Sequence, residues 1–415
     1  QWQAVTINLT PDPTLDDSPA MTRTELRASG ALASIFALRM LGLFLVLPVF
    51  ALEARKYPGG DDPALIGLAM GIYGLTQGIL QIPFGMASDR LGRKRVIIFG
   101  LLVFALGSLV AGGADTLMGV LAGRALQGAG AVSAAVTALL ADLTRDVVRT
   151  KAMALVGASI GLMFALSLVV SPVIASHIGL SGLFVLTAVL ALLGTAVVVW
   201  GVPAEPDVHK DAARGGLRHV LSSPALLRLN IGVFVLHAVQ LAMWVAIPAF
   251  LVQAGLGKDD HWQIYLPAVL GSFALMGGVF PLERRGYLRA VFLSAIALIA
   301  LVQVALLWVS SGAPSITCLA WLLFAFFCGF NVLEATQPSL VSRIAPASSR
   351  GAAMGVYNTL QSLGFFAGGV MGGQLVKSYG TQGLFLTCAA LMLMWLVVAW
   401  PMVAPKRVAH MTKTA

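Results

Sequence analysis

The chain has 415 residues, of which 58% are hydrophobic and only 11% are charged, and its mean hydropathy is +0.88. Soluble domains carry about a quarter charged residues, so this composition excludes an ordinary soluble protein and predicts that most of the surface faces lipid. The net charge of +9 does not indicate nucleic-acid binding, because the cations lie in short loops between apolar runs rather than in one stripe.

The first 20 residues are polar and acidic and lack the apolar core of a signal peptide, and we expect a disordered tail over 1–27. From residue 28 onward, long apolar runs alternate with short polar turns. Each run is long enough to span about 30 Å of hydrocarbon as a helix. The runs are 28–52, 63–88, 96–113, 116–141, 151–175, 180–201, 225–253, 262–281, 288–310, 315–342, 351–376 and 380–403.

The longest polar stretch within this region, 203–224, predicts a linker between two six-helix halves, 28–202 and 225–404, with a tail over 405–415. A weak internal repeat agrees with this division. The pattern at 89–96 recurs at 283–290, with an acid, Arg, Gly and a final Arg in register. The sequence thus predicts an all-α polytopic membrane protein with twelve transmembrane helices in two pseudo-symmetric halves, an arrangement typical of alternating-access transporters.

Lys and Arg are distributed unequally between the two sets of loops. Twenty-one of the 27 lie in segments that share a side with both termini, four lie in the opposite loops, and two lie inside runs. Cytoplasmic loops carry the excess of Lys and Arg in membrane proteins. We therefore expect both termini in the cytoplasm.

A short basic turn, Gly85-Met-Ala-Ser-Asp89-Arg90-Leu-Gly92-Arg93-Lys-Arg, separates the second run from the third. Asp89 directly follows the apolar run, where it can meet cations or a helix N-terminus. Gly85 and Gly92 permit close backbone approach and chain reversal. An ordinary positive-inside stop signal is the simpler interpretation of the charges, whereas the full pattern favours a conformational-switch loop.

Four ionisable residues lie well inside predicted spans, away from the span ends: Arg39, Arg124, His237 and Glu334. Charges are expensive in the bilayer, so we expect these groups to face a wet cavity or one another. Glu334 is the one carboxylate well inside a span and is our candidate proton carrier. The alternatives are snorkelling for the arginines, a structural hydrogen bond for Glu334, and a packed neutral imidazole for His237.

Further polar residues recur at helical spacing and predict a polar path between the halves. They are Tyr73, Gln77 and Gln81 in the second run, Gln127 in the fourth, Asn331 in the tenth, and Tyr357 and Gln361 in the eleventh. Interhelical hydrogen bonds are the alternative interpretation. Apolar and aromatic neighbours such as Phe44 and Phe330 predict a cavity that is mostly apolar with a few charges.

The turn at 85–95 resembles the signature loop of the major facilitator superfamily, which controls the change between outward-open and inward-open states. The segment from Arg124 to Gly130 resembles the superfamily's fourth-helix motif, in which the Arg is linked to proton transfer. The fifth run resembles the antiporter motif with every glycine replaced, and Ser167, Ser171 and Pro172 supply its small and kinking positions.

Over about residues 22–403 the chain is most similar to YajR-type members of the proton-coupled drug antiporter group. The resemblance implies a cytoplasmic charge cluster of Asp89, Arg93 and Asp142. Proteins of this type usually continue into a small soluble domain after the last helix. This chain stops at Ala415, and we expect no regulation by such a domain.

We predict a monomeric secondary transporter in the bacterial inner membrane, which works by alternating access and exports hydrophobic or amphipathic small molecules in exchange for protons. The sequence has no phosphate-binding loop, metal-ligand set or nucleophile–base pair, so we expect no enzyme, cofactor or metal. The alternatives are a proton-coupled symporter or importer of a small polar or anionic metabolite and, more distantly, a transport-dead membrane sensor.

Overall fold

The computed structural model describes residues 20–130, 132–205, 217–312, 314–346 and 349–402. The regular structure of these residues is helical, without strands. Ten helical segments among them are long and apolar enough to cross a membrane. The predicted all-α membrane protein is therefore confirmed.

Among the described residues, the N-terminal half contains six α-helices: α1 (Arg23–Glu53), α2 (Pro63–Leu91), α3 (Arg93–Gly112), α4 (Leu117–Ala129), α5 (Ser133–Asp142) and α6 (Asp146–Ala196). The predicted span 116–141 is divided between α4 and α5. Gly130 leaves the helical conformation, with ψ at 47°, and ends α4 there.

The start of α1 corrects one prediction, because residues 23–27 are helical and do not belong to a disordered tail. The hydroxyl of Thr22 accepts from the N–H of Glu25 at 3.2 Å, and the Glu25 carboxylate accepts from the N–H of Thr22 at 2.8 Å. This reciprocal capping box stabilises a helix start at the residue after Thr22. Residues 1–19 lie outside the described residues.

The C-terminal half contains α7 (Leu217–Ser222), α8 (Pro224–Gln253), α9 (Trp262–Leu282), α10 (Leu288–Val309), α11 (Ile316–Ile344) and α12 (Arg350–Ala399). Helix α7 lies within the predicted linker 203–224, of which 206–216 are outside the described residues. The predicted tail 405–415 is also outside them.

Two helices, α6 and α12, are 51 and 50 residues long. An uninterrupted helix of that length would measure about 75 Å, more than twice the hydrocarbon thickness. Each is broken by a glycine with non-helical angles: Gly179 (φ 66°, ψ −173°) and Gly380 (φ 66°, ψ −172°). The breaks fall where the sequence separates the fifth span from the sixth and the eleventh from the twelfth. The count of twelve stays a prediction that agrees with both breaks.

The described glycines with positive φ form three pairs at corresponding places in the two halves. They are Gly59 and Gly255 (91° and 95°), Gly92 and Gly286 (96° and 99°), and Gly179 and Gly380 (66° and 66°). The middle pair is the glycine of the internal repeat. The repeat therefore extends from sequence to backbone conformation, which supports two pseudo-symmetric halves.

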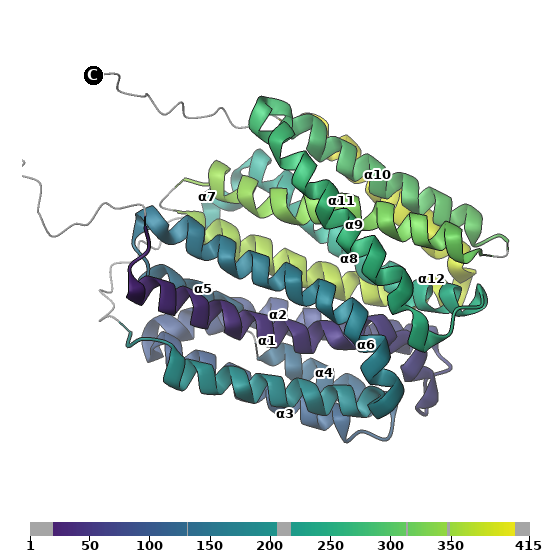
Figure 1. Ribbon diagram of the computed structural model, residues 1–415, viewed down its shortest axis with the longest axis horizontal. Coiled ribbons are helices and arrows are strands. Elements are labelled where there is room, and N and C mark those ends of the chain that lie inside the picture. The colour runs from purple at the N-terminus through teal and green to yellow at the C-terminus, as the bar shows by residue number, and fades with distance from the viewer. Residues whose placement is uncertain (1–19, 131, 206–216, 313, 347–348, 403–415) are drawn as a thin grey trace, which may run out of the picture.

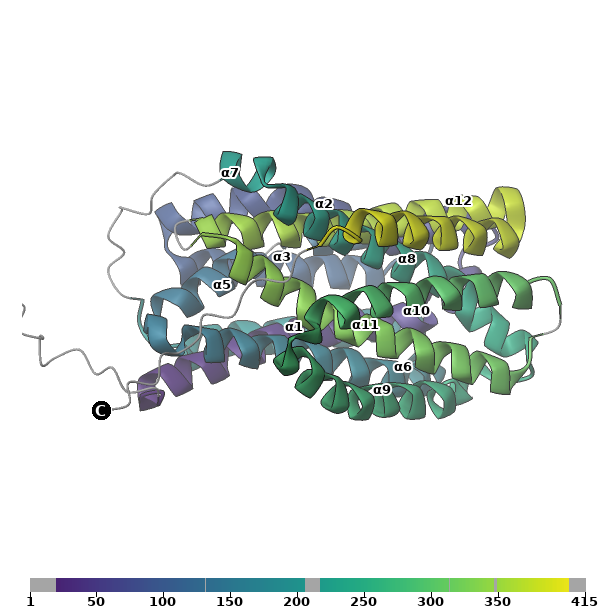
Figure 2. The same ribbon diagram turned by 90° about the horizontal axis from the view of Figure 1, so that it is seen from above.

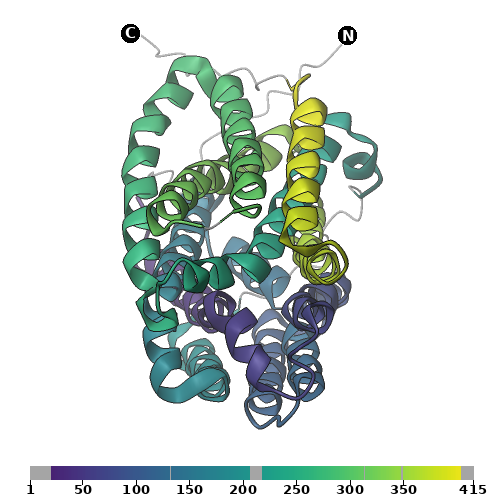
Figure 3. The same cartoon turned by 90° about the vertical axis from the view of Figure 1, so that its right-hand side faces the viewer.

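We call the end at which α1 begins and α7 lies the linker end, and the opposite end the far end (Figure 1). Figure 3, which looks along the molecule from the far end, shows the purple and blue helices of the N-terminal half beside the green and yellow helices of the C-terminal half. Two seams between the halves, α2 with α12 and α6 with α9, lie on opposite sides in Figure 2, and α1 also packs against α8.

The α2–α12 seam is closed by backbone contact toward the far end. A Cβ on Gly67 would lie 2.7 Å from the Cα of Gly373, and a Cβ on Gly369 would lie 2.8 Å from the Cα of Gly71. Only glycine permits such an approach. A Cβ on Gly355, nearer the linker end of α12, would meet nothing within 4 Å. The two halves are thus packed together at the far end.

Candidate functional site

Arg39 on α1 is buried inside the N-terminal half. It donates to the Tyr73 hydroxyl at 2.6 Å and to the Ser133 hydroxyl at 3.1 Å, and its guanidinium carbon lies 5.6 Å from the centroid of the Phe104 ring. These contacts offset part of the cost of burying a cation. Arg39 is therefore held by side chains of α2, α3 and α5 and does not snorkel to a surface.

Arg124 on α4 is also buried. Its Nε donates to the carbonyl oxygen of Ala69 at 2.6 Å and its Nη2 to that of Met70 at 3.0 Å. Its guanidinium carbon lies 5.4 Å from the ring centroid of Phe50 and 6.0 Å from that of Tyr73. Tyr73 thus connects the two buried cations, one through its hydroxyl and the other through its ring.

The three predicted glutamines of α2 and α4 are also buried. Gln127 on α4 donates to the Ser108 hydroxyl on α3 at 2.8 Å. This contact is an interhelical hydrogen bond, the alternative to a place in a polar path. Neither polar side-chain atom of Gln81 has a hydrogen-bond partner among the described residues. Gln77 lies one helical turn before Gln81, so both belong to one face of α2.

Helices α8, α11 and α12 bring Glu334, His237 and Gln361 together in the C-terminal half. The Oε1 of Glu334 lies 3.1 Å from Nε2 of His237. The Nε2 of Gln361 lies 2.9 Å from the same ring nitrogen, and Nδ1 of His237 lies 2.8 Å from the Val233 carbonyl oxygen. The Glu334 side chain is 32% exposed, whereas His237 is buried.

These contacts define where a proton can reside. Nδ1 of His237 carries a hydrogen, because the carbonyl oxygen of Val233 can only accept. In the neutral imidazole Nε2 is bare and accepts from the Gln361 amide. In the imidazolium Nε2 carries a hydrogen, and the charged ring forms an ion pair with the Glu334 carboxylate at 3.1 Å. One proton can therefore be held on either group with a suitable partner, which is the chemistry of a proton-binding site.

Two further predicted residues lie near this group in sequence but make different contacts. Asn331, one turn before Glu334, donates to the Ser272 hydroxyl at 2.8 Å and so joins α11 to α9. Tyr357 on α12 is buried, and its hydroxyl has no hydrogen-bond partner among the described residues. Asn331 therefore has a structural role, whereas the Tyr357 hydroxyl is available to hydrogen-bond a water or a ligand.

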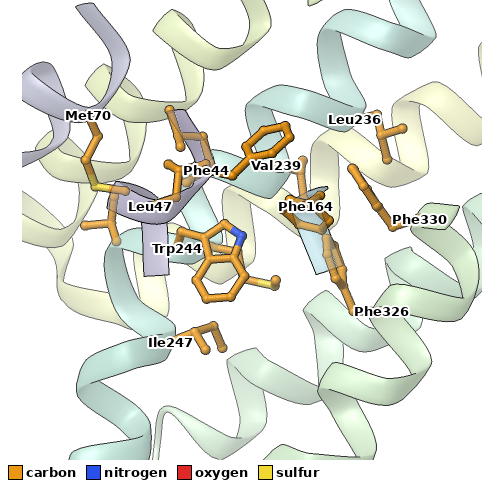
Figure 4. Close-up of a cluster of buried hydrophobic side chains, with 14 of the residues drawn as sticks. Phe44, Leu47, Met70, Phe164, Leu236, Val239, Trp244, Ile247, Phe326 and Phe330 are labelled. Carbon is orange, nitrogen blue, oxygen red and sulfur yellow. The ribbon is translucent and has the colours of Figure 1, made fainter. Parts of the chain in front are cut away.

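An aromatic plug contains rings from both halves, among them the labelled Phe44, Phe164, Phe326 and Phe330 (Figure 4). It lies on the far-end side of Glu334, because Phe330 precedes Glu334 on α11, which begins at the far end. Its members are Phe44 on α1, Phe164 on α6, and Phe326, Phe327 and Phe330 on α11. The Phe164 centroid lies 5.1 Å from that of Phe44, 6.2 Å from that of Phe327 and 6.0 Å from that of Phe330. The plug separates the Glu334 group from the far end along the boundary between the halves.

The switch loop holds the charge cluster that the family resemblance implies. Arg93 donates from Nε to Asp142 at 3.1 Å and from Nη1 to Ser88 at 2.8 Å, and it also pairs with Asp89. All these residues belong to the N-terminal half, so their pairing alone does not join the two halves. The cluster is formed in a conformation whose far end is closed.

The other members of the loop have simpler surroundings. Gly92 takes a φ of 96°, which permits the chain reversal expected there. A Cβ on Gly85 would meet only Ala134, at the ordinary distance of 3.6 Å, so no tight backbone approach depends on this glycine. The Arg90 side chain is exposed.

Sequence reasoning missed two acidic residues at the linker end. Glu205 accepts from the backbone N–H groups of Arg93, at 2.9 Å, and Lys94, which caps the start of α3. Glu25 pairs with Arg145 at 2.9 Å and so joins α1 to the turn before α6. The spacing of Thr22 and Glu25 is the local sequence pattern of a capping box and could have indicated the role of Glu25. No local pattern indicates that Glu205 contacts the start of α3, which is 112 residues away in the chain.

Ion pairs across the two halves at the far end were also missed. Glu53 at the end of α1 pairs with Lys258 of the short helix η3 (Lys258–Asp260) at 2.8 Å, and with Lys56 at 2.5 Å. Asp62, the N-cap of α2, pairs with Lys377 of α12 at 2.9 Å. These far-end ion pairs close the same end as the glycine seam.

The small-residue motif of α6 contacts α1. The Ser171 hydroxyl donates to the carbonyl oxygen of Leu45, and the Ser167 hydroxyl donates to that of Phe164 at 2.6 Å. Pro172 lies inside the helix, where it removes one backbone donor. Small side chains here permit α6 to pack closely against α1.

Residues 32–369 and 281–414 match the model of the Major Facilitator Superfamily. The chain is 42% identical over 399 residues to the inner membrane transport protein YajR of Escherichia coli, covering 94% of this chain and 86% of that protein. It is 26% identical over 356 residues to the multidrug resistance protein MdtH of Aeromonas hydrophila, covering 83% and 86%.

The crystal structure of the human organic anion transporter MFSD10 has a similar fold, with a TM-score of 0.66 at 18% identity. The alignment covers 91% of this chain and 100% of that one. At this identity the likeness concerns the fold alone.

Proposed function

The chain belongs to the Major Facilitator Superfamily and is a secondary transporter of that type, and we propose that it exports hydrophobic or amphipathic compounds in exchange for protons. The observation that carries the proposal is the group of Glu334, His237 and Gln361, which can hold one proton on either of two sites. The name of the relative MdtH supports a drug-like substrate.

Proton and substrate compete at this group. An ionised Glu334 bordered by aromatic rings attracts the cationic end of an amphipathic molecule. A proton on Glu334 removes that attraction and releases the molecule. The ionised carboxylate therefore favours binding of the substrate, and the protonated carboxylate favours its release. This difference is the basis of exchange between substrate and proton.

The alternative of an anionic substrate has less support from the geometry. Both buried arginines are occupied by partners inside the N-terminal half, through Tyr73, Ser133 and the backbone of α2. Among the described residues, no hydrogen bond or ion pair joins either arginine to Glu334. We propose that they maintain the structure of the N-terminal half rather than bind an anion.

We further propose that the linker end faces the cytoplasm of a bacterial inner membrane. The excess of Lys and Arg in the loops on that side supports this orientation. In the described conformation Glu334 would then exchange with the cytoplasm, because the aromatic plug and the far-end contacts lie between it and the outside.

The test uses purified protein in liposomes that contain a pH-sensitive dye, with ethidium as the probe substrate. We expect Glu334→Gln to abolish the ethidium transport driven by a pH gradient and the accompanying proton flux, while exchange of ethidium at equal pH continues. Asp115→Asn, which changes an exposed carboxylate outside the spans, is the matched control. A Glu334→Gln variant that still responds to the gradient would contradict the proposal.

A further inference from the structure

A small cavity lies at the linker end of the C-terminal half, where α8 and α10 begin and α11 and α12 end. We call it the linker-end cavity. One charged side chain, that of Arg228, lines it, and the rest of its wall is apolar. The apolar lining residues are Ala225, Leu229, Phe292, Ile344, Ala399 and Met402. Several lining residues are partly exposed, so the cavity is accessible from the surface.

Arg228 lacks a counter-charge in this cavity. Its side chain is partly buried, and it makes no hydrogen bond or ion pair with the described residues. Other arginines at the same end have partners, as Arg93 does with Asp142 at 3.1 Å. A cation partly removed from water is stabilised by an anion that accepts its hydrogen bonds. The position of Arg228 therefore favours an anionic ligand.

Two further arginines adjoin the lining residues. Arg289 lies one helical turn before Phe292, and side chains three residues apart are neighbours on a helix. Its Nη2 donates to the carbonyl oxygen of Trp400 at 2.7 Å, and its guanidinium carbon lies 5.7 Å from the centroid of the Trp400 ring. Arg343, which is exposed, directly precedes Ile344. Three cations thus lie in or beside the cavity.

No described carboxylate side chain of the C-terminal half balances these cations. Residues 217–402 contain four acidic residues. Asp259 and Asp260 lie at the far end, Glu334 lies within its span, and the side chain of Glu283 is outside the described part of the chain. The described linker-end side chains of this half therefore create a positive potential, which attracts anions.

The aromatic residues beside the cavity indicate its depth in the membrane. Trp400, which follows Ala399, is 61% exposed, and Tyr287, which precedes α10, is 58% exposed. Exposed Trp and Tyr are enriched at the level of the lipid headgroups. At that level a phosphate can meet Arg228 while an acyl chain contacts the apolar wall. A soluble anion would gain nothing from that wall.

We propose that the linker-end cavity binds one anionic phospholipid from the adjacent leaflet. Its phosphate pairs with Arg228, and the upper part of one acyl chain packs against the apolar wall. Arg289 and Arg343 add to the attraction of the headgroup. The bound lipid joins the linker ends of α8 and α11, the helices that carry His237 and Glu334. This binding does not depend on the proposed exchange of substrate and protons.

The first experiment measures lipid binding by native mass spectrometry of the purified protein. It is titrated with dioleoyl phosphatidylglycerol or with dioleoyl phosphatidylcholine, which has the same chains and no net charge. We expect the first phosphatidylglycerol to bind more tightly than the first phosphatidylcholine. Arg228→Gln should weaken binding of phosphatidylglycerol about tenfold, the effect of one lost charged hydrogen bond, whereas Arg228→Lys should retain most of it.

Arg23→Gln is the matched control, because Arg23 is exposed at the linker end of the N-terminal half and lies outside the cavity. It removes the same charge and should leave the affinity for phosphatidylglycerol unchanged. An equal loss of affinity in Arg23→Gln and Arg228→Gln would show that the lipid responds to net charge only, and it would overturn the site.

The second experiment fills the cavity without changing a charge. Ala225 is partly exposed in the first turn of α8, where a larger side chain is compatible with folding. We expect Ala225→Phe to weaken binding of phosphatidylglycerol about as much as Arg228→Gln does. The melting temperature of each variant without lipid shows whether it is folded. Phosphatidylglycerol should raise the melting temperature of the parent, whereas inorganic phosphate should not.

Each contrary outcome overturns the proposal. Equal affinities of the parent for the two lipids, or an unchanged affinity in both Arg228→Gln and Ala225→Phe, would exclude an anionic lipid site here. Equal stabilisation by inorganic phosphate would indicate a soluble anion, and displacement of the lipid by ethidium would indicate a substrate site. None of these measurements involves transport, so the proposed function is decided separately by Glu334→Gln.

Discussion

Closure of the far end should depend on the absence of side chains along the α2–α12 seam. In Gly67→Ala, the new methyl carbon would come within 2.7 Å of the Cα of Gly373 and nearer still to the carbonyl oxygen of Gly369. Ordinary contacts of this kind are 3.4–4 Å long. The neighbours are backbone atoms, which cannot rotate away, so the halves must separate to accommodate the methyl group.

The size of the effect follows from the cost of overpacking, about 1–3 kcal/mol for one extra methyl group in a tight contact. A middle value of about 2 kcal/mol changes the ratio of closed to open far ends about thirtyfold. Gly355→Ala, on α12, is the matched control, because its methyl group would meet nothing within 4 Å. The two substitutions share the gain in helix propensity, so that gain cancels in the comparison.

Spin labels at Asp61→Cys and Ser378→Cys report the opening, because both positions are exposed and lie on opposite halves near the Asp62–Lys377 ion pair. We expect a dominant short distance in the parent and in Gly355→Ala, and a dominant long distance in Gly67→Ala. If the folded Gly67→Ala protein kept the parent's distance distribution, glycine packing would not be what closes the far end.

Three further predictions concern charged groups. Asp89→Asn should slow transport severalfold without loss of substrate binding, because Arg93 keeps another carboxylate partner; equal loss of binding and turnover in the ethidium assay would contradict a conformational role. Arg39→Ala should lower the melting temperature of the purified protein, since it leaves the buried Tyr73 hydroxyl unpaired. The pH midpoint of ethidium binding should stay unchanged. A shifted midpoint would show that this cation acts on Glu334. Lys377 and a backbone N–H hold the pKa of Asp62 below its usual value, so the ionised form of Asp62 stabilises the closed far end. This stabilisation is fully present above about pH 4 and is progressively lost as the pH falls further. Spin-label distances should therefore be constant between about pH 5 and 8, and opening within that range would exclude this pair as the pH-sensitive element.

The sequence by itself predicted the membrane-spanning helices, the division into two halves and the residues whose burial needs an explanation. These features depend on local properties, since apolar length decides whether a helix spans the bilayer and a buried charge is conspicuous in an apolar run. The glycine shared by the internal repeat also had a local consequence, because Gly92 and Gly286 both take the positive φ that a reversal needs.

Only the tertiary structure decided which groups meet. Arg39 was expected to share a space with Glu334, but its partners are Tyr73 and Ser133, while Glu334 pairs with His237. Periodicity tells which residues share a face of one helix, whereas the rotation of each helix about its axis is decided by packing against its neighbours. For the same reason the far-end ion pairs could not be read from the chain, because their members lie on different helices and are brought together by packing alone.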